Sequence, residues 1–330
     1  MDTFRACRIF EENGKSSGRL VEMTLNELDA GEVVIRTAYS SVNFKDALTA
    51  TGGGKVVRRF PCVGGIDGCG TVVTSADPRF KPGDEVICTS YDLGVAHDGG
   101  YAGMMRVPAD WVVPLPRGLS LFEAMALGTA GYTSALAIHL LEHNGMTPAG
   151  GKVVVNGATG GCASLAISML ANLGYKVSAV TGKSDEHDYL KSIGAAEVLG
   201  RDALPAGTRP LEKSQWAAGF DSVGGTQLAA MIRSMHQHGV IGSFGNAGGI
   251  ELQTTVLPFI LRGVRLIGVD SAATPMPLRQ AVWARLATDL KPPHIASIAT
   301  TITLDDLPAT FVRMLKQQTK GRTVVQMSSQ

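Results

Sequence analysis

The sequence predicts an α/β protein of two domains, one rich in β-strands and one with a parallel sheet between helices. Three observations lead to this expectation: the chain has 330 residues, its first third is rich in β-branched runs, and strand and helix patterns alternate after residue 121. Single domains usually have about 100–200 residues, so this length suits two. We expect residues 1–125 and 272–330 to form the β-rich domain, and residues 126–271 the other.

The first third of the chain contains β-branched runs separated by Gly, Pro and Asp, which is typical of strands joined by turns. Pro82, Gly83 and Asp84 are residues that tight turns favour, and they precede one of these runs. The predicted strands lie at 31–43, 70–75 and 84–90.

The middle of the chain alternates between buried-strand and helix patterns. Strands are predicted at 153–158, 176–181, 196–200, 220–225, 239–245 and 265–271, and helices at 160–174, 184–194 and 226–239. Such alternation predicts βαβ units, and therefore a parallel sheet with helices on both faces. Two more helices, at 278–290 and 305–320, precede a last strand at 321–327.

Composition excludes several classes of protein. Hydrophobic residues make up 45% and charged residues 18%, which is incompatible with an intrinsically disordered chain. Lys and Arg (30) balance Asp and Glu (29) without a long basic run, so nothing indicates a nucleic-acid partner. The five cysteines show neither a CxxC pair nor an even count, which favours a reduced, cytoplasmic setting. The apolar stretch 124–141 contains Gly, Thr, Ser and His, so we expect a buried core helix rather than a membrane span.

A glycine-rich turn is the strongest local signal. The predicted strand 153–158 leads into Gly157, Ala158, Thr159, Gly160, Gly161 and Cys162, and a helix follows. Glycines allow the backbone to turn sharply beside a pyrophosphate, and the helix N-terminus offers N–H groups to it. The context favours the dinucleotide site of a Rossmann doubly wound domain. The alternative is an ordinary strand–turn–helix connection.

The end of the next strand distinguishes NADP from NAD. An acidic residue there would bind the 2′-hydroxyl of NAD. This chain instead has Thr181, Gly182 and Lys183, and Arg201 follows the next strand. Cations and hydroxyls suit a 2′-phosphate, so we expect NADP(H), although Asp185 is close enough to keep NAD open. The alternative for Lys183 is a solvated loop lysine.

The whole chain resembles the medium-chain dehydrogenase/reductase superfamily, with its GroES-like catalytic domain and Rossmann domain. Zinc alcohol dehydrogenases of that superfamily have a metal-site Cys early in the chain and a Gly-His-Glu motif slightly later. Asn43 occupies the cysteine position, and Ile66 the histidine position in Gly65-Ile66-Asp67. The resemblance therefore implies a member without zinc.

Within the zinc-free, quinone oxidoreductase-like branch, the chain resembles the acrylyl-CoA reductase (NADPH) subfamily. Phe44 stands where that subfamily commonly has Tyr, and residues 91–98 also differ from its pattern, so the substrate preference is open. The segments that carry the resemblance are SSVNFKDALTATGGGKVVRRFPCVGGIDGCGTV, GTAGYTSA, LGYKVSAVTGKSDEHDYLKSIGA, PLEKSQW, TTVLPFILRGVRLIGVDS and KGRTVV.

The resemblance implies NADPH-dependent reduction of acrylyl-CoA to propionyl-CoA. Hydride goes to the β-carbon, and negative charge develops on the thioester oxygen, where amide donors can stabilise it. Asn43 is our candidate for this catalytic role, with a structural role at the strand end as an equal alternative. Lys45 and Asp46 could form an ion pair that orients this loop. Tyr132 and His97 are candidate proton donors, with packing or solvation as the alternatives.

The resemblance also implies a set of cofactor contacts and an acyl-CoA substrate. Arg322 could contact the cofactor or the CoA, or form a structural salt bridge. Lys55, Arg58 and Arg59 could bind CoA phosphates or be solvated. Besides Arg322, the implied cofactor-binding residues are Phe44, Thr159, Gly160, Gly161, Cys162, Thr181, Gly182, Lys183, Arg201, Asn246, Ile260 and Ser271.

Three further expectations concern assembly and activity. The family suggests a homodimer formed through sheet edges. An NADPH:quinone oxidoreductase, or a reductase of other small enones, would keep the same cofactor residues. A non-catalytic NADPH-binding protein would also keep them, and Phe44 in place of Tyr is consistent with that alternative.

Overall fold

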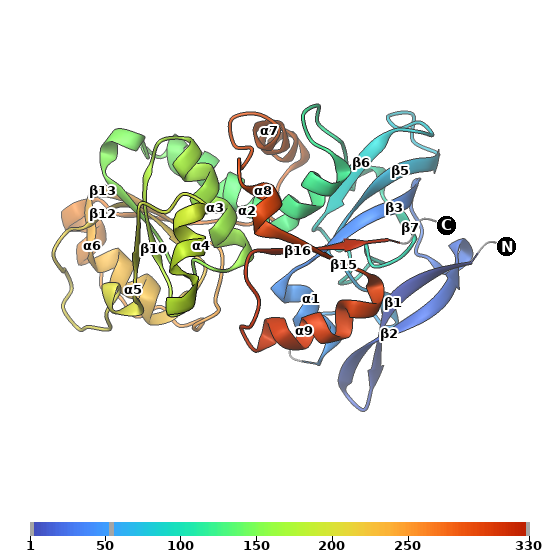
Figure 1. Ribbon diagram of the computed structural model, residues 1–330, viewed down its shortest axis with the longest axis horizontal. Helices are drawn as coiled ribbons and strands as arrows, with labels where there is room; N and C mark the ends of the chain where they lie inside the picture. The colour runs from blue at the N-terminus through green and yellow to red at the C-terminus, as the bar shows by residue number, and fades with distance from the viewer. Residues whose placement is uncertain (1–2, 53–55, 328–330) are drawn as a thin grey trace. The chain divides into compact units, whose positions relative to one another are not determined.

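The computed structural model describes residues 3–52 and 56–327, which fall into two compact units (Figure 1). Unit 1 extends to Thr129 and includes residues 272–283 and those from 295 onward; unit 2 comprises residues 130–271 and 284–294. We expected the boundary at 125/126 and placed 284–294 in the β-rich domain. In the structure these residues group with unit 2, where Arg285 pairs with Glu142 at 2.8 Å.

Unit 1 is built on antiparallel β-structure. A hairpin of β1 (Thr3–Glu12) and β2 (Lys15–Thr24) is extended by β4 (Cys62–Val63). A larger sheet has the order β15-β16-β3-β5-β6-β8, and β7 also pairs with β3. The strands of this sheet are β3 (Val33–Val42), β5 (Asp67–Ser75), β6 (Glu85–Thr89), β7 (Met104–Val107), β8 (Val112–Pro114), β15 (Ala299–Ile302) and β16 (Arg322–Gln326).

Two helices close the core of unit 1. The short helix α1 (Phe44–Ala50) contacts α9 (Leu307–Leu315). Leu307 and Phe311, one turn apart on α9, are buried in a cluster that includes Ile9 of β1. This packing holds the start of α1, and therefore Asn43 before it, in a fixed position. Two further helices, α7 (Met276–Leu286) and α8 (Ile295–Ile298), precede β15 in the chain.

Unit 2 contains a sheet in which every strand pair is parallel, in the order β11-β10-β9-β12-β13-β14. This confirms the predicted doubly wound domain. The order reverses between β9 and β12, and right-handed crossovers in opposite directions place α3 and α5 on opposite faces. The elements are β9 (Lys152–Val155), α3 (Gly161–Asn172), β10 (Lys176–Val180), α4 (His187–Ser192), β11 (Glu197–Leu199), β12 (Trp216–Asp221), α5 (Gly225–Arg233), β13 (Met235–Ser243), α6 (Leu257–Arg262) and β14 (Arg265–Gly268).

One helix of unit 2 is shorter than predicted. We expected a helix over 226–239, but α5 ends at Arg233 and β13 begins at Met235. The first half of β13 contains His236, Gln237 and His238, whose polar side chains hide the strand pattern. Met235 is fully buried, and it anchors this end of the strand.

The most apolar segment forms α2 (Leu121–His143), and 83% of its most apolar stretch is buried. By length and composition it is the one candidate membrane span in the described residues, and its burial is that of a core helix. Gly128 has φ 50° and ψ −155°, which interrupts the helix and requires glycine. The segment therefore consists of two helical parts, and Thr129 begins the second.

Candidate active site

The glycine turn joins β9 to α3 at the carboxyl end of the parallel sheet. Gly157 has φ 59°, a left-handed conformation that glycine adopts without strain. Gly160 is the N-cap of α3, and within the described chain no side chain bonds to this cap. A helix N-terminus of this kind suits an anion, and binding of a pyrophosphate there stays a prediction.

A buried polar network behind the turn was not predicted. Ser222 donates a hydrogen bond to the Asn156 carbonyl at 3.0 Å, and the Asn156 side-chain amide donates to Asp221 at 2.7 Å. A Cβ atom on Gly157 would overlap the Ser222 hydroxyl. The network thus joins the ends of β9 and β12, the two strands at the reversal of strand order where ligands bind in such sheets.

The same network fixes the loop that contains Asn246. The fully buried Asp221 accepts hydrogen bonds from the Gly224 N–H at 2.9 Å and the Ser243 hydroxyl at 3.0 Å. Gly224 in turn forms a β-bridge with Gly249. Asn246 is exposed on this supported loop beyond β13, at the sheet edge where it was expected.

The end of β10 presents the residues predicted to bind a 2′-phosphate. The Thr181 hydroxyl accepts a hydrogen bond from the Lys183 N–H at 3.1 Å and so shapes this turn. A Cβ atom on Gly182 would lie 2.6 Å from Nε of Arg201, so the guanidinium lies directly against this glycine. Asp185 is exposed two residues after Lys183, in a short 3₁₀ turn. The structure therefore brings Arg201 to Thr181–Lys183, which fits a phosphate.

The other predicted cofactor residues are more dispersed. The Ser271 hydroxyl accepts a hydrogen bond from Thr133 at 2.7 Å. Cys162 lies in the first turn of α3, where its carbonyl accepts from the Ser134 hydroxyl at 2.8 Å. Ile260 is 68% exposed on α6, and Phe44 is 47% exposed at the start of α1 in unit 1. Cofactor contacts by these residues stay predictions.

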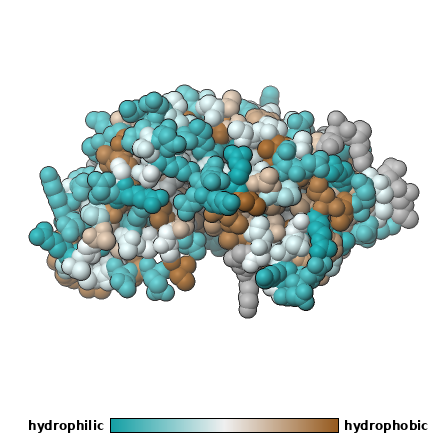
Figure 2. All heavy atoms as spheres, turned by 60° about the horizontal axis from the view of Figure 1, so that its bottom comes forward, coloured by the Kyte–Doolittle hydropathy of each residue, from teal (hydrophilic) through white to brown (hydrophobic). Residues whose placement is uncertain are grey.

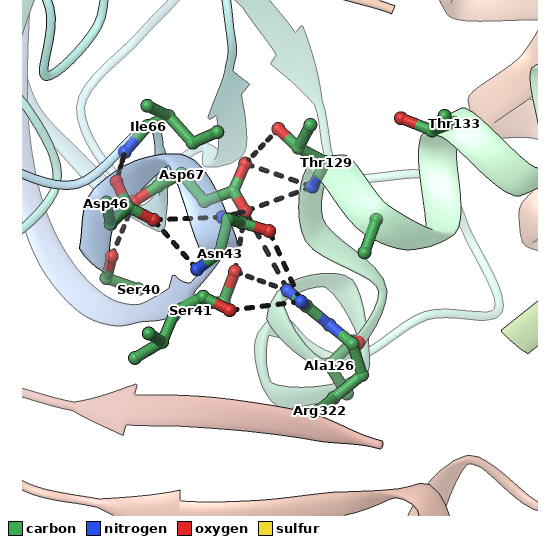
Figure 3. Close-up of polar contacts among 12 residues, drawn as sticks. Ser40, Ser41, Asn43, Asp46, Ile66, Asp67, Ala126, Thr129, Thr133 and Arg322 are labelled. Carbon is green, nitrogen blue, oxygen red and sulfur yellow. Dashed lines mark hydrogen bonds and ion pairs between the residues drawn. The ribbon is translucent and has the colours of Figure 1, made fainter. Parts of the chain in front are cut away.

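Asn43 lies in a buried cluster of charged and polar side chains in unit 1 (Figure 3). Its amide nitrogen donates to Asp67 at 2.8 Å and to Asp46 at 3.2 Å, and its amide oxygen accepts from Arg322 at 3.2 Å. Both N–H bonds of the amide are used within the protein, so neither is available for a substrate oxygen. The contacts support our structural alternative for Asn43, which is also the N-cap of α1.

Arg322 is the cation of this cluster and is 3% exposed. Its guanidinium donates to the carbonyls of Ala126 at 3.0 Å and Val42 at 3.1 Å, and to the Ser41 hydroxyl at 2.7 Å. It also lies 3.9 Å from the Asp67 carboxylate. Since all three nitrogens bond within unit 1, the structure corrects the prediction of a cofactor contact in favour of the structural salt bridge.

Two carboxyl groups complete the cluster. Asp46 accepts backbone N–H bonds from Asn43 at 2.8 Å and Ile66 at 3.0 Å. Asp46 therefore points inward, and among the described residues no ion pair joins it to the exposed Lys45, so a purely structural role is favoured. Burial, and then the nearby Asp67, raise the pKa of Asp46 to about 7. Asp67 accepts from the Thr129 N–H at 3.0 Å and its hydroxyl at 2.5 Å, which caps the second part of α2.

Comparison with known proteins identifies the family. Residues 29–117 match the alcohol dehydrogenase GroES-like domain, and residues 161–288 match the zinc-binding dehydrogenase family. The putative quinone oxidoreductase YhfP of Bacillus subtilis is 45% identical, over 98% of this chain and 99% of that protein. The chain belongs to the medium-chain dehydrogenase/reductase superfamily.

Two more relatives place the chain in the quinone oxidoreductase-like branch with the acrylyl-CoA reductases. Acrylyl-CoA reductase AcuI of Ruegeria pomeroyi is 45% identical, over 97% of each chain. The yhdH oxidoreductase of Salmonella enterica, solved in complex with NADP, has a TM-score of 0.96 at 45% identity, over 98% of this chain and 100% of that one. YhfP, solved with NAD bound, has a TM-score of 0.97 over 99% of this chain and 100% of that one.

Zinc members of the superfamily have a cysteine and a histidine where this chain has Asn43 and Ile66. Neither side chain here is a usual zinc ligand. Within residues 3–52 and 56–327, no group of three or more His, Cys, Asp and Glu side chains is arranged to hold a metal ion.

The candidate proton donors lie in packed surroundings. Both ring nitrogens of His97 lie against backbone carbonyls, those of Asp98 at 3.1 Å and Ala30 at 3.0 Å. Its ring also packs edge-on to Trp111. Tyr132 is fully buried in unit 2. These positions support the packing alternatives that the sequence left open for both residues.

The basic group considered for CoA phosphates is already paired. Arg58 forms an ion pair with Asp92, and Arg59 pairs with Asp29 and also lies 3.3 Å from Asp98. Lys55 lies outside the described residues. Both arginines hold the 92–98 loop to its surroundings, so the structure does not support a CoA-phosphate site there.

Proposed function

We propose that this protein is an NADPH-dependent reductase of the 2,3-double bond of acrylyl-CoA, which it converts to propionyl-CoA. The observation that carries the proposal is the 45% identity to an acrylyl-CoA reductase over 97% of both chains. The likeness spans both units, so it is not confined to the cofactor-binding domain.

Support for NADPH comes from the end of β10. Relatives of this chain have been solved with NADP and with NAD, so family membership alone does not decide between the two. Lys183 and Arg201 supply two cations beside Gly182, and the strand end has no carboxylate to meet a 2′-hydroxyl. A guanidinium and an ammonium together suit the double charge of a phosphate.

NADPH bound at this site supplies the hydride for the reduction. The protein contributes binding and orientation: the first-turn amides of α3 bind the pyrophosphate, and Lys183 with Arg201 binds the 2′-phosphate. The buried network of Asp221, Asn156 and Ser222 keeps the loops rigid, so that the cofactor binds in one orientation. Since the Asn43 amide is saturated, we assign its role to holding α1 and not to contact with the thioester oxygen.

An NADPH:quinone oxidoreductase is the second candidate, because YhfP is as similar to this chain as AcuI is. The test is NADPH oxidation by the purified protein with acrylyl-CoA, beside a simple quinone at equal concentration. We expect fast turnover of acrylyl-CoA, little turnover of quinone, and propionyl-CoA as the product. Turnover of quinone alone would reject the proposal but leave the family and fold unchanged. NADPH binding without turnover of either compound would support the non-catalytic alternative.

We further propose that the protein is a cytoplasmic homodimer. The edge strand β14 has a partner on one side within the described sheet, and exposed apolar side chains lie on the segment before it. This segment contains Ile250, Leu252, Val256, Ile260 and Leu261. Figure 2 shows one face of the molecule, on which hydrophobic residues are scattered among hydrophilic ones. Light scattering should give twice the monomer mass, and Ile260→Lys should reduce it towards one copy.

A further inference from the structure

We propose that unit 1 contains a second ligand site, a cleft that binds an amphipathic carboxylate. The cleft has a volume of about 860 Å³, within the range of about 300–1,000 Å³ usual for small-molecule sites. Its lining residues all belong to unit 1, and none is among the residues implied for cofactor or substrate.

The cleft lies where two strands meet along one side of β3. Met104 of β7 pairs with Arg36, whereas β16 begins its pairing at Tyr39, opposite Gln326. Between these pairs, the Gly103 carbonyl accepts from the Thr37 N–H and the Ala38 carbonyl accepts from the Met327 N–H, both at 3.0 Å. On the other side of β3, the register with β5 shifts between Thr37 and Tyr39, and such bulges often occur at functional sites.

The walls of the cleft are mainly apolar and half-buried. Leu25, Tyr39, Val73 and Met104 line it, and Tyr39 is held in an edge-on contact with Phe122. These side chains can bury an acyl chain or an aromatic ring, at about 25 cal/mol for each Å² removed from water. The cleft therefore has room and apolar surface for the body of an amphipathic molecule.

The charge of the lining selects the head group. Arg5 and Arg36 are the charged residues among the lining, and no carboxylate is among them. Arg5 is neutralised by two hydrogen bonds to Asp305, at 3.1 and 2.5 Å. Arg36 is exposed, its cross-strand neighbours Thr71 and Met104 are uncharged, and it has no ion pair within residues 3–52 and 56–327. One unpaired guanidinium fits a single negative charge, and its planar donors match a carboxylate.

The test uses octanoate as the probe, titrated into the full-length protein by calorimetry. We expect saturable binding that weakens at least about tenfold in Arg36→Gln, since a hydrogen bond to a charged group contributes about 1.5–3 kcal/mol. Met104→Trp should also abolish binding, because the indole would fill the cleft. Arg19→Gln is the matched control: this arginine is 51% exposed on β2, outside the cleft, and its loss should leave binding unchanged.

Octan-1-ol and octylammonium separate charge recognition from simple apolar binding. Both should bind at least about tenfold more weakly than octanoate, because neither offers an anion to Arg36. Equal binding of octanoate by wild type and Arg36→Gln, or no saturable binding by a folded wild type, would overturn the proposal. Since the readout is binding and not turnover, failure here would leave the proposed reductase function intact.

Discussion

The carboxyl edge of the unit 2 sheet and the buried cluster of unit 1 use polar groups in opposite ways. At the sheet edge, the N-cap Gly160 of α3 makes no side-chain cap hydrogen bond, and Asn246 is exposed. In the cluster, Asn43, Arg322 and Asp67 bond to one another and are withdrawn from solvent. The comparison shows that a polar residue at a family's active-site position need not be free to react. A polar group can bind a ligand only where the protein does not already use its hydrogen-bond donors and acceptors, and a group whose donors and acceptors are all used has a structural role.

The largest effect should come from removing the cation of the cluster. Arg322→Met leaves the Asp67 carboxylate buried without its counter-ion, and breaking a buried pair in this way costs about 3–5 kcal/mol. Chemical unfolding should show a loss of that size. Arg313→Met, on the exposed face of α9, should change stability by less than about 0.5 kcal/mol. A loss as small as the control's would mean that the cluster does not depend on its cation.

At the sheet edge, the largest effect should come from the turn. Gly157→Ala forces a left-handed alanine into the Ser222 hydroxyl, so NADPH affinity should fall about 30–100-fold, equivalent to about 2–3 kcal/mol. Gly174→Ala is a matched control, because Gly174 has φ 82° and nothing lies within 4 Å of an added Cβ. Fluorescence titration of NADPH measures both. Equal losses in the two variants would indicate general strain and not a specific effect on the turn.

A smaller effect on cofactor binding tests whether the sheet edge binds the 2′-phosphate. Lys183→Ala should weaken NADPH about tenfold and leave NADH unchanged, because only NADPH has the 2′-phosphate. The preference between the two cofactors, taken from initial rates at several concentrations, reports this directly. Lys191→Ala, on the last turn of α4, serves as the control. Parallel losses for both cofactors would contradict the assignment of Lys183 to the phosphate.

A separate prediction concerns the pH dependence of the cluster. The pKa of Asp46 rises from its ordinary 3.8 to about 7 on folding, so the folded state binds this proton more tightly than the unfolded state. The resulting stability is fully present below pH 3.8 and is lost as pH rises to about 7.

Asp46→Asn should therefore flatten the pH dependence of the unfolding free energy between pH 4 and 7. Asp305→Asn should not flatten it, because Arg5 lowers the pKa of that carboxyl and it titrates below this window. The slope is the quantity to compare, since Asp46→Asn also removes one acceptor for a backbone N–H. An unchanged slope in Asp46→Asn would show that another group causes it.

Much of unit 2 could be predicted from sequence because its signals are local. The inner strands of a parallel sheet are apolar runs, and the glycine turn needs particular residues at adjacent positions. The β1–β2 hairpin was not predicted as two strands, because much of β2 is polar or only half-buried. The start of β13 was mistaken for helix for a similar reason.

The cluster of unit 1 could not be predicted because its contacts are remote in sequence. Arg322 and Asn43 are 279 residues apart, and Asn43 and Asp67 are 24 apart. The family resemblance suggested that the polar residue Asn43 lies near the active site. Only the structure shows which groups accept the two N–H bonds of its side-chain amide. The sequence predicted Arg201 only as a second cation for the phosphate. Its contact with Gly182 could not be predicted, because the distance between the two residues depends on how the 3₁₀ turn after β11 folds.

The interruption of α2 at Gly128 makes this helix dependent on its protein surroundings. At Gly128 and Thr129 the backbone leaves the helical bonding pattern, and Asp67 accepts the Thr129 N–H instead. In a lipid bilayer no such acceptor would be present, and each unsatisfied backbone group there costs several kcal/mol. The same 23 residues that satisfy a hydropathy criterion for a membrane span would thus form a poor one, because the interruption at Gly128 leaves backbone groups that the protein satisfies and lipid would not.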